Sequence, residues 1–218
     1  MTINRGRRAV AAAILLSGLA ACAATRPTAF YTLSSDATPK QPRSTKGMVI
    51  GLGPVSLPAY LDRPDIVTRE GMNEMRLAEF NRWAEPLEPL LARIMAQDLY
   101  ALLDAQDVIP LPQRRDTRLD RVVEVDVSQL DADAHGQVMF DARWRVYRGD
   151  GETLLANGHS QITEQGAPPP DYTAIVAAMS RAVGAATADI AAAIRGTPMP
   201  AAKGAAEPSP KVVRRPAA

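Results

Sequence analysis

The 218-residue chain has one cysteine, Cys22, and two histidines, His135 and His159. A single thiol excludes a disulfide within the chain, and so few thiols and imidazoles leave few ligands for a metal site. Neither histidine belongs to an HExxH motif or accompanies a nucleophile elbow, and the stretch GLGPV at 51–55 lacks the third glycine of a phosphate-binding loop. We therefore expect no enzymatic activity, no metal and no cofactor.

An excess of one charge is also lacking. The 25 Lys and Arg residues stand against 24 Asp and Glu residues, which gives a formal net charge of +1. A nucleic-acid-binding domain carries a strong positive excess, so nucleic acid is not an expected partner. Hydrophobic residues at 46% and charged residues at 22% are ordinary for a globular protein, and the chain has enough material for one core.

The one cysteine follows an apolar run near the N-terminus. Three arginines precede this run, and residues 9–16 have the length of a signal-peptide core, which is too short to span a bilayer. The sequence LAAC at 19–22 matches the bacterial lipobox, in which the cysteine is acylated and becomes the mature N-terminus. We predict a lipoprotein signal peptide at 1–21 and a covalent lipid on Cys22, such as palmitate. A plain signal peptide with an incidental cysteine is the alternative.

Lipidation would fix the compartment of the mature protein. Several acyl chains on one residue hold a protein stably at a membrane, because each buried methylene contributes about 0.8 kcal/mol. Removal of the signal peptide takes away three arginines and no acids, so the formal charge changes from +1 to −2. Ala23 follows the cysteine, where Asp would favour the inner membrane. We expect a lipid-anchored domain on the periplasmic face of the outer membrane, with the inner membrane as the alternative.

Both ends of the mature chain have the composition of connecting segments. Residues 34–47 are rich in Pro, Ser and Thr, and the five prolines of 196–218 interrupt any apolar periodicity. A late basic cluster in that tail reads as solubilising, with contact to anionic lipid or cell wall as the alternative; it comprises Lys211, Arg214 and Arg215. The predicted divisions are a signal peptide at 1–21, a lipidated N-terminus with a short strand and linker at 22–47, one domain at 48–195 and a disordered tail at 196–218.

Within the domain, the apolar pattern alternates between strand and helix periods. After a short strand at 30–33, it predicts the order β-β-β-α-β-β-β-α. The predicted strands are 48–57, 66–69, 74–81, 122–130, 138–147 and 153–163, and the predicted helices are 86–103 and 171–195. Asp171 is suited to be the N-cap of the second helix. The fold class is α/β, a single mixed sheet covered by two helices.

The turn at 133–136 predicts a hairpin whose register can be stated. The apolar faces of both strands must lie on one side of the sheet, so opposite residue numbers should sum to 269. The expected pairs are Glu124 with Arg145, Val125 with Trp144, and Asp126 with Arg143. A slip by two residues would set Asp126 against Asp141, and like charges directly opposite one another destabilise a sheet.

Three stretches of sequence carry a family resemblance. FYTL at 30–33, GLGPVSLPAYLDRPDIVTR at 51–69 and LAEFNRWAEPLEPLLARIMAQDL at 77–99 resemble the periplasmic auxiliary lipoproteins of ABC-type transport systems, the PqiC family. The resemblance runs from the signal peptide to the last helix. It implies a lipoprotein that works beside an ABC permease and an MCE-domain protein in lipid transport and envelope integrity.

A second class of function stays open beside the first. The same small α/β fold would serve a structural or regulatory envelope lipoprotein, such as an assembly factor or an activator of cell-wall synthesis, without lipid contact. The transported lipid, its direction and the formation of a homo-oligomer are also open.

Two short segments give candidate site residues. Prolines bracket the loop 58–64, which presents Tyr60 and Leu61 between the positive charges of Arg63 and Arg69. These four residues are candidate contacts for a partner or an acyl chain. The alternative is that Tyr60 and Leu61 pack into the sheet and anchor the loop.

The second segment, RWAEPL at 82–87, precedes the first predicted helix. We expect Trp83 to pack at the start of that helix, and Arg82 and Glu85 to pair with each other or to cap it. Pro86 suits the first turn of a helix because its missing N–H needs no partner there.

Overall fold

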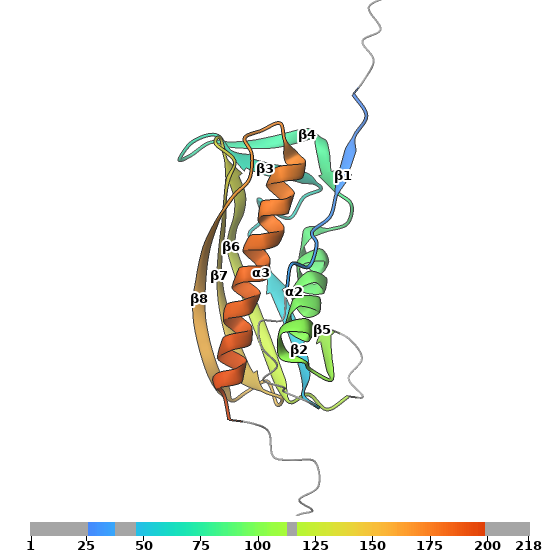
Figure 1. Ribbon diagram of the computed structural model, residues 1–218, viewed down its shortest axis with the longest axis vertical. Helices are drawn as coiled ribbons and strands as arrows, with labels where there is room; N and C mark the ends of the chain where they lie inside the picture. Colours follow the sequence, from blue (N-terminus) through green and yellow to red (C-terminus); the bar gives the residue numbers. More distant parts are fainter. Residues whose placement is uncertain (1–25, 38–46, 113–116, 199–218) are drawn as a thin grey trace, which may run out of the picture.

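The computed structural model describes residues 26–37, 47–112 and 117–198 (Figure 1). Cys22, the signal peptide expected at 1–21 and residues 199–218 of the expected tail lie outside this part of the chain. The lipid on Cys22 and the disorder of the tail therefore remain predictions.

The described residues form eight strands and two helices. The strands are β1 (Ala29–Tyr31), β2 (Val49–Ser56), β3 (Asp65–Arg69), β4 (Met75–Trp83), β5 (Asp107–Pro110), β6 (Arg121–Asp133), β7 (Gln137–Arg148) and β8 (Leu154–Gln165), and the helices are α2 (Leu87–Leu103) and α3 (Tyr172–Gly196). Every predicted strand and helix is present. β5 was not predicted, because a strand of four residues is too short to show an alternating pattern.

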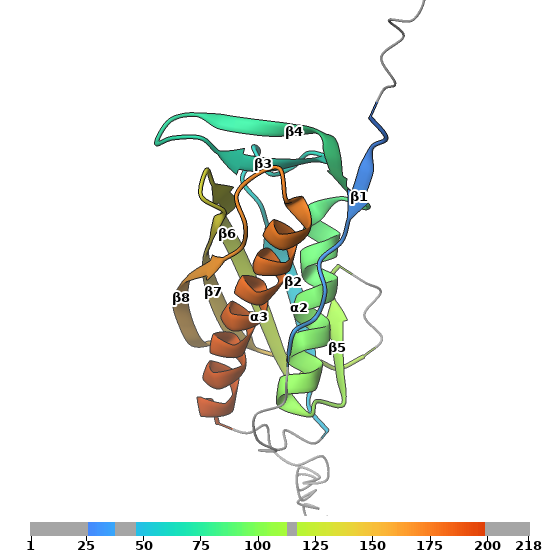
Figure 2. The same cartoon turned by 45° about the horizontal axis from the view of Figure 1, so that its top comes forward.

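One mixed sheet contains all eight strands. Its longest strand, β6, pairs on one side with antiparallel β7 and on the other with β2 and β3, which both run parallel to it. β8 extends the sheet beyond β7, β4 and β1 extend it beyond β3, and β5 extends it beyond β2. Both helices pack on one face of the sheet and against each other (Figures 1 and 2). The predicted fold class is confirmed.

The predicted register of the β6–β7 hairpin is also confirmed. Glu124 lies opposite Arg145, Val125 opposite Trp144 and Asp126 opposite Arg143. An ion pair joins Glu124 Oε2 to Arg145 Nη1 at 3.9 Å. The pairing shifts by one residue between Val127 and Gln129, a bulge that the sequence pattern did not predict.

The core lies between the helices and the inner face of the sheet. The apolar faces of α2 and α3 are buried there, together with the inward-facing valines of β6 and the aromatic residues Phe140 and Trp144 of β7. Asp171 caps α3 as predicted, since its Oδ1 accepts the N–H of Ala174 at 3.0 Å. By length and composition α3 could cross a membrane, but 61% of its most apolar window is buried inside the domain, so here it is a core helix.

The segment after β1 runs along the helices before the chain enters the sheet (Figure 1). Leu33 is buried, the N–H of Ser34 donates to Ser180 Oγ on α3 at 3.1 Å, and the hydroxyl of Ser35 donates to Asp98 on α2. We call residues 32–37 the N-terminal strap. The first residues of the linker expected at 34–47 therefore contact both helices, while residues 38–46 lie outside the described part of the chain.

Candidate functional site

Two of the stretches that carry the family resemblance meet in space. The loop between β2 and β3 lies against the connection from β4 to α2, where the N–H of Trp83 donates to the carbonyl oxygen of Pro64 at 2.7 Å. Together they enclose a cavity of about 340 Å³. Its lining residues, which define the loop pocket, are Asp62, Arg63, Pro64, Trp83, Ala84, Glu85, Pro86 and Leu87.

The loop pocket has an apolar floor and one incompletely satisfied cation. Trp83 and Leu87 are both buried in the core below it. Arg63 is half-buried, and its buried Nε–H donates to no atom of the described residues. A buried N–H without an acceptor costs about 1–3 kcal/mol, and more on a charged group.

The four candidate contact residues do not form one surface. Leu61 is only 3% exposed and belongs to the core, while its N–H donates to the Pro58 carbonyl at 2.9 Å and closes a turn. Tyr60 is half-buried and packs against the same core. Of the four, Arg63 alone lines the loop pocket. The role of these residues in contacting a partner or a lipid remains a prediction.

Tyr60 and Arg69 instead meet at a buried carboxylate, Asp131 of β6, which is 2% exposed. The Tyr60 hydroxyl donates to Asp131 Oδ2 at 3.0 Å, and Arg69 donates from Nε and Nη2 to both carboxylate oxygens at 3.2 and 3.1 Å. Burial and the Asp131 charge raise the pKa of Tyr60, and the hydrogen bond to Asp131 raises the pKa of Arg69. The carboxylate of Asp131 therefore balances the positive charge of Arg69. The hydrogen bonds among Tyr60, Arg69 and Asp131 link the β2–β3 loop to β6.

Sequence reasoning missed Asp131 and misplaced the partners of two neighbouring residues. Arg82 Nε donates to Asp65 Oδ1 at 3.0 Å, and Glu85 accepts from Arg93 in the second turn of α2, so Arg82 and Glu85 do not pair with each other or cap the helix. The N-cap of α2 is Pro86, and no side chain caps it. The sequence shows Asp131 only as an acidic residue near the end of an apolar strand. This position does not reveal its partners Tyr60 and Arg69, which lie more than 60 residues away.

The histidines show no catalytic arrangement. His135 is exposed in the β6–β7 turn. His159 Nε2 lies 2.9 Å from Asp141 Oδ2, and Ser128 donates to the other oxygen of the same carboxylate. This order places the carboxylate between serine and histidine, so the imidazole cannot take the serine proton as it does in a catalytic triad. The described residues include no group of three or more side chains placed to hold a metal ion.

The comparisons with known proteins agree with this fold. The chain matches the ABC-type transport auxiliary lipoprotein component family over residues 31–191, and it belongs to that family. The family is an accessory component of a transport system and not a class of enzymes. No curated protein matches the sequence.

Two crystal structures share the architecture. Protein XCC0632 from Xanthomonas campestris is 16% identical, with a TM-score of 0.64 over 78% of this chain and 97% of that chain. A structure described as an uncharacterized protein is 18% identical, with a TM-score of 0.61 over 78% of this chain and 99% of that chain. At these identities the likeness concerns the fold alone.

Proposed function

We propose that this protein is the lipid-anchored accessory component of an ABC/MCE-type lipid transport system that maintains the cell envelope. Membership of the auxiliary lipoprotein family supports the general accessory role. The observation that carries the finer proposal is the position of the loop pocket beside the strand that leads to the anchor. In this proposal Cys22 holds the protein in the outer membrane, the domain lies in the periplasm, and its partners are an MCE-domain protein and the permease complex.

The position follows from chain length and contacts. Ala29, the first residue of β1, is seven positions after Cys22, so an extended connection reaches at most about 25 Å. The N–H of Ala84, in the wall of the loop pocket, donates to the carbonyl oxygen of Tyr31 in β1 at 2.8 Å. β1 and β4 lie together at one end of the domain (Figure 2). The pocket would therefore stand within reach of the membrane surface.

The chemistry of the pocket suits an amphiphile with an acidic head group. A phosphodiester would pair with the guanidinium group of Arg63, and the apolar floor formed by Trp83 and Leu87 would receive the first methylenes of an acyl chain. A cavity of about 340 Å³ is too small for a whole phospholipid. The pocket would hold one end of a lipid in passage and would not store it.

A photoreactive phosphatidylglycerol tests this contact on the full-length lipoprotein in vesicles. Arg63→Gln should lower crosslinking to the segment 83–87 at least fivefold, because the head group loses its charged donor. Arg143→Gln is the matched control, since Arg143 is exposed on β7 at the outer face of the sheet. Equal labelling of Arg63→Gln and the wild type would contradict lipid contact at the loop pocket.

A genetic experiment tests the pathway. Deletion of the gene should sensitise cells to detergents, and deletion together with the cognate MCE protein should be no worse than loss of the MCE protein alone. Additive defects would contradict a shared pathway and would favour the structural or regulatory class of envelope lipoprotein.

A further inference from the structure

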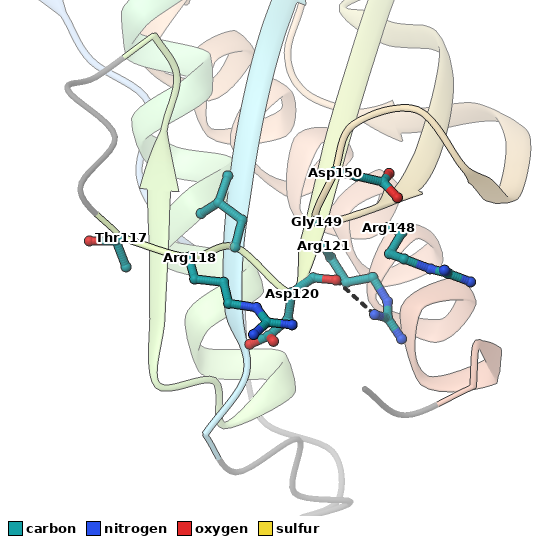
Figure 3. Close-up of a pocket in the computed structure, with 8 residues that line it drawn as sticks. Thr117, Arg118, Asp120, Arg121, Arg148, Gly149 and Asp150 are labelled. Carbon is teal, nitrogen blue, oxygen red and sulfur yellow. Dashed lines mark hydrogen bonds between the residues drawn. The ribbon is translucent and has the colours of Figure 1, made fainter. Parts of the chain in front are cut away.

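A second cavity, with a volume of about 470 Å³, lies at the other end of the domain (Figure 3). Its walls are the residues that lead into β6 and the turn between β7 and β8. Its lining residues, which define the arginine pocket, are Thr117, Arg118, Leu119, Asp120, Arg121, Arg148, Gly149 and Asp150. These residues belong neither to the three stretches that carry the family resemblance nor to the loop pocket.

The length of helix α3 gives the distance between the end of the domain at β1 and the end at the arginine pocket. Tyr172, at its first turn, contacts the ring of Tyr31 in β1 with centroids 6.5 Å apart. Thr197, just past its last turn, accepts a hydrogen bond from Arg121 in the arginine pocket at 3.2 Å. The 25 residues of α3 extend about 37 Å. The arginine pocket is therefore at the pole remote from β1 and from the expected anchor.

The pocket brings together three guanidinium groups, none of which forms an ion pair with a carboxylate of the described residues. The two carboxylates of the pocket, Asp120 and Asp150, accept hydrogen bonds from backbone N–H groups. Asp120 Oδ2 accepts the N–H of Val49 at 2.8 Å. Asp150 Oδ1 accepts the N–H groups of Thr153 at 3.0 Å and Glu152 at 2.8 Å, and these bonds lower its pKa. The pocket thus holds three guanidinium groups and two carboxylates, and among the described residues no carboxylate is in ion-pair contact with any of the three arginines.

Arg121 is the costliest of the three to bury, since it is only 2% exposed. Its donors reach only neutral oxygens: Thr197 Oγ1, the Asp120 carbonyl at 2.8 Å and the Pro198 carbonyl. Burial lowers its pKa, and the charge of Arg148 lowers it further while Asp120 opposes the change. A buried charge without an opposite charge in contact costs several kcal/mol. An anion bound in the pocket would supply that opposite charge.

The walls of this site are fixed by backbone contact. A methyl group at Gly149 would overlap the carbonyl oxygen of Leu119, so only glycine lets the β7–β8 turn approach the strand entry this closely. Arg118 and Arg148 are exposed on either side of Arg121, which is buried (Figure 3). A rigid concave site with one buried and two exposed guanidinium groups can bind an inserted carboxylate side chain, and its exposed groups can bind the neighbouring acidic residues of the same peptide.

We infer that the arginine pocket is a docking site for an acidic peptide segment of a protein partner, with one Glu or Asp side chain inserted toward Arg121 and others meeting Arg118 and Arg148. The distance of about 37 Å from the anchor end places the site away from the head groups of the anchoring membrane, which favours a soluble acidic segment over a lipid. The choice of a peptide over a lipid rests on the proposed anchor at Cys22, whereas the inference does not depend on the function of the loop pocket.

Fluorescence polarisation with a labelled Glu/Asp-rich decapeptide tests the inference on the mature lipoprotein in detergent micelles. Arg148→Gln should weaken binding at least tenfold, and Arg118→Gln with Arg148→Gln should weaken it further. Arg143→Gln is the matched control, because it makes the same change five residues earlier on the same strand. Arg121 is not substituted, since it also holds the end of α3.

Binding should also weaken as salt concentration rises, because the contacts are between exposed charges. Failure of the wild type to bind, or equal weakening by Arg148→Gln and Arg143→Gln, would overturn the inference. Competition by inorganic phosphate at the same molar concentration as the peptide would identify a small-anion site instead. Binding that needs removal of residues 199–218 would identify the tail of this chain as the occupant.

Discussion

Among the described residues, several arginines at the anchor end of the domain pair with carboxylates, Arg63 being an exception, whereas none of the three arginines of the arginine pocket does. Ion pairs at the anchor end include Arg69 with Asp131, Arg76 with Glu70, and Arg82 with Asp65. The same end exposes large apolar side chains: Met72 at the tip of the β3–β4 hairpin is 90% exposed, and Phe30 on β1 is 66% exposed. In the arginine pocket the guanidinium groups contact neutral oxygens or solvent.

The difference separates two kinds of recognition on one small domain. Neutralised charge beside exposed apolar side chains suits the region next to a bilayer, where unpaired charge would be costly to desolvate. Unpaired charge in a fixed concave site suits an anionic partner in water. Removing features of one end should therefore leave the other end unchanged, and the following experiments use that expectation.

The largest effect is expected at the anchor. Cys22→Ser removes the only thiol, so it should abolish palmitate incorporation and leave the signal peptide uncleaved by the lipoprotein signal peptidase. Metabolic labelling and membrane fractionation measure both results. Label that persists in the variant would contradict acylation of Cys22, and mature protein in the inner membrane would contradict the outer-membrane assignment alone. The purified domain of the variant should still bind the acidic peptide.

Removal of the buried carboxylate is the next largest change. Asp131→Ala leaves Arg69 partly buried without its partner, so the free energy of unfolding should fall by about 3–5 kcal/mol. Urea unfolding followed by circular dichroism measures the loss. Arg148→Gln at the far end should leave the midpoint unchanged, since Arg148 is exposed and forms no ion pair among the described residues. A similar loss in both variants would contradict the contrast between the two ends.

A smaller effect is expected from the exposed apolar residues. Phe30→Ser with Met72→Ser should weaken binding of the unlipidated domain to phosphatidylglycerol vesicles about tenfold, because apolar area is lost from the membrane-facing end. Sedimentation with vesicles gives the partition coefficient. Leu154→Ser is the control, since Leu154 is also exposed but begins β8, next to the β7–β8 turn that forms a wall of the arginine pocket. Equal losses in both proteins would indicate nonspecific adsorption.

The smallest effect concerns Asp141, on the outer face of the sheet between the two ends. Burial raises the pKa of its carboxyl, but hydrogen bonds from Ser128 and His159 outweigh burial and lower the pKa overall. A lowered folded-state pKa means that ionised Asp141 stabilises the fold above its unfolded pKa of about 3.9 and that this contribution disappears as pH falls through the folded value. The stability difference between wild type and Asp141→Asn should therefore shrink below pH of about 4. A difference that stays constant down to pH 2 would contradict this assignment.

The local parts of the fold could be predicted from the sequence, and the sites could not. The β6–β7 register depends on a short turn and on the order of charges in two adjacent segments, so Glu124 and Arg145 could be matched directly. The bulge near Ser128 has no such sequence signal. β5 was also not predicted, because four residues show too little periodicity to distinguish a strand from a loop.

The loop pocket and the arginine pocket both depend on contacts between distant segments. The family resemblance drew attention to Arg63 and Trp83, but only the fold shows that their segments share one cavity. It also shows Leu61 in the core and Arg69 neutralised by Asp131, which spacing could not reveal. Arg121 sits in an alternating strand and meets Thr197 across 76 positions, so its burial has no local signature.

The N-terminal strap has a mechanical consequence. β1 is bound to β4 in parallel register over three residue pairs, and the strap continues from it to hydrogen bonds on α3 and α2. A partner that pulls on the arginine pocket while Cys22 is held in a membrane loads this joint along the axis of β1. The hydrogen bonds between β1 and β4 are then loaded together in shear and do not break one by one. Pulling from residue 22 in an optical trap would measure the force at which they break. Tension between membrane and partner would thus be borne first by β1 and the strap, before it reached the hydrophobic core.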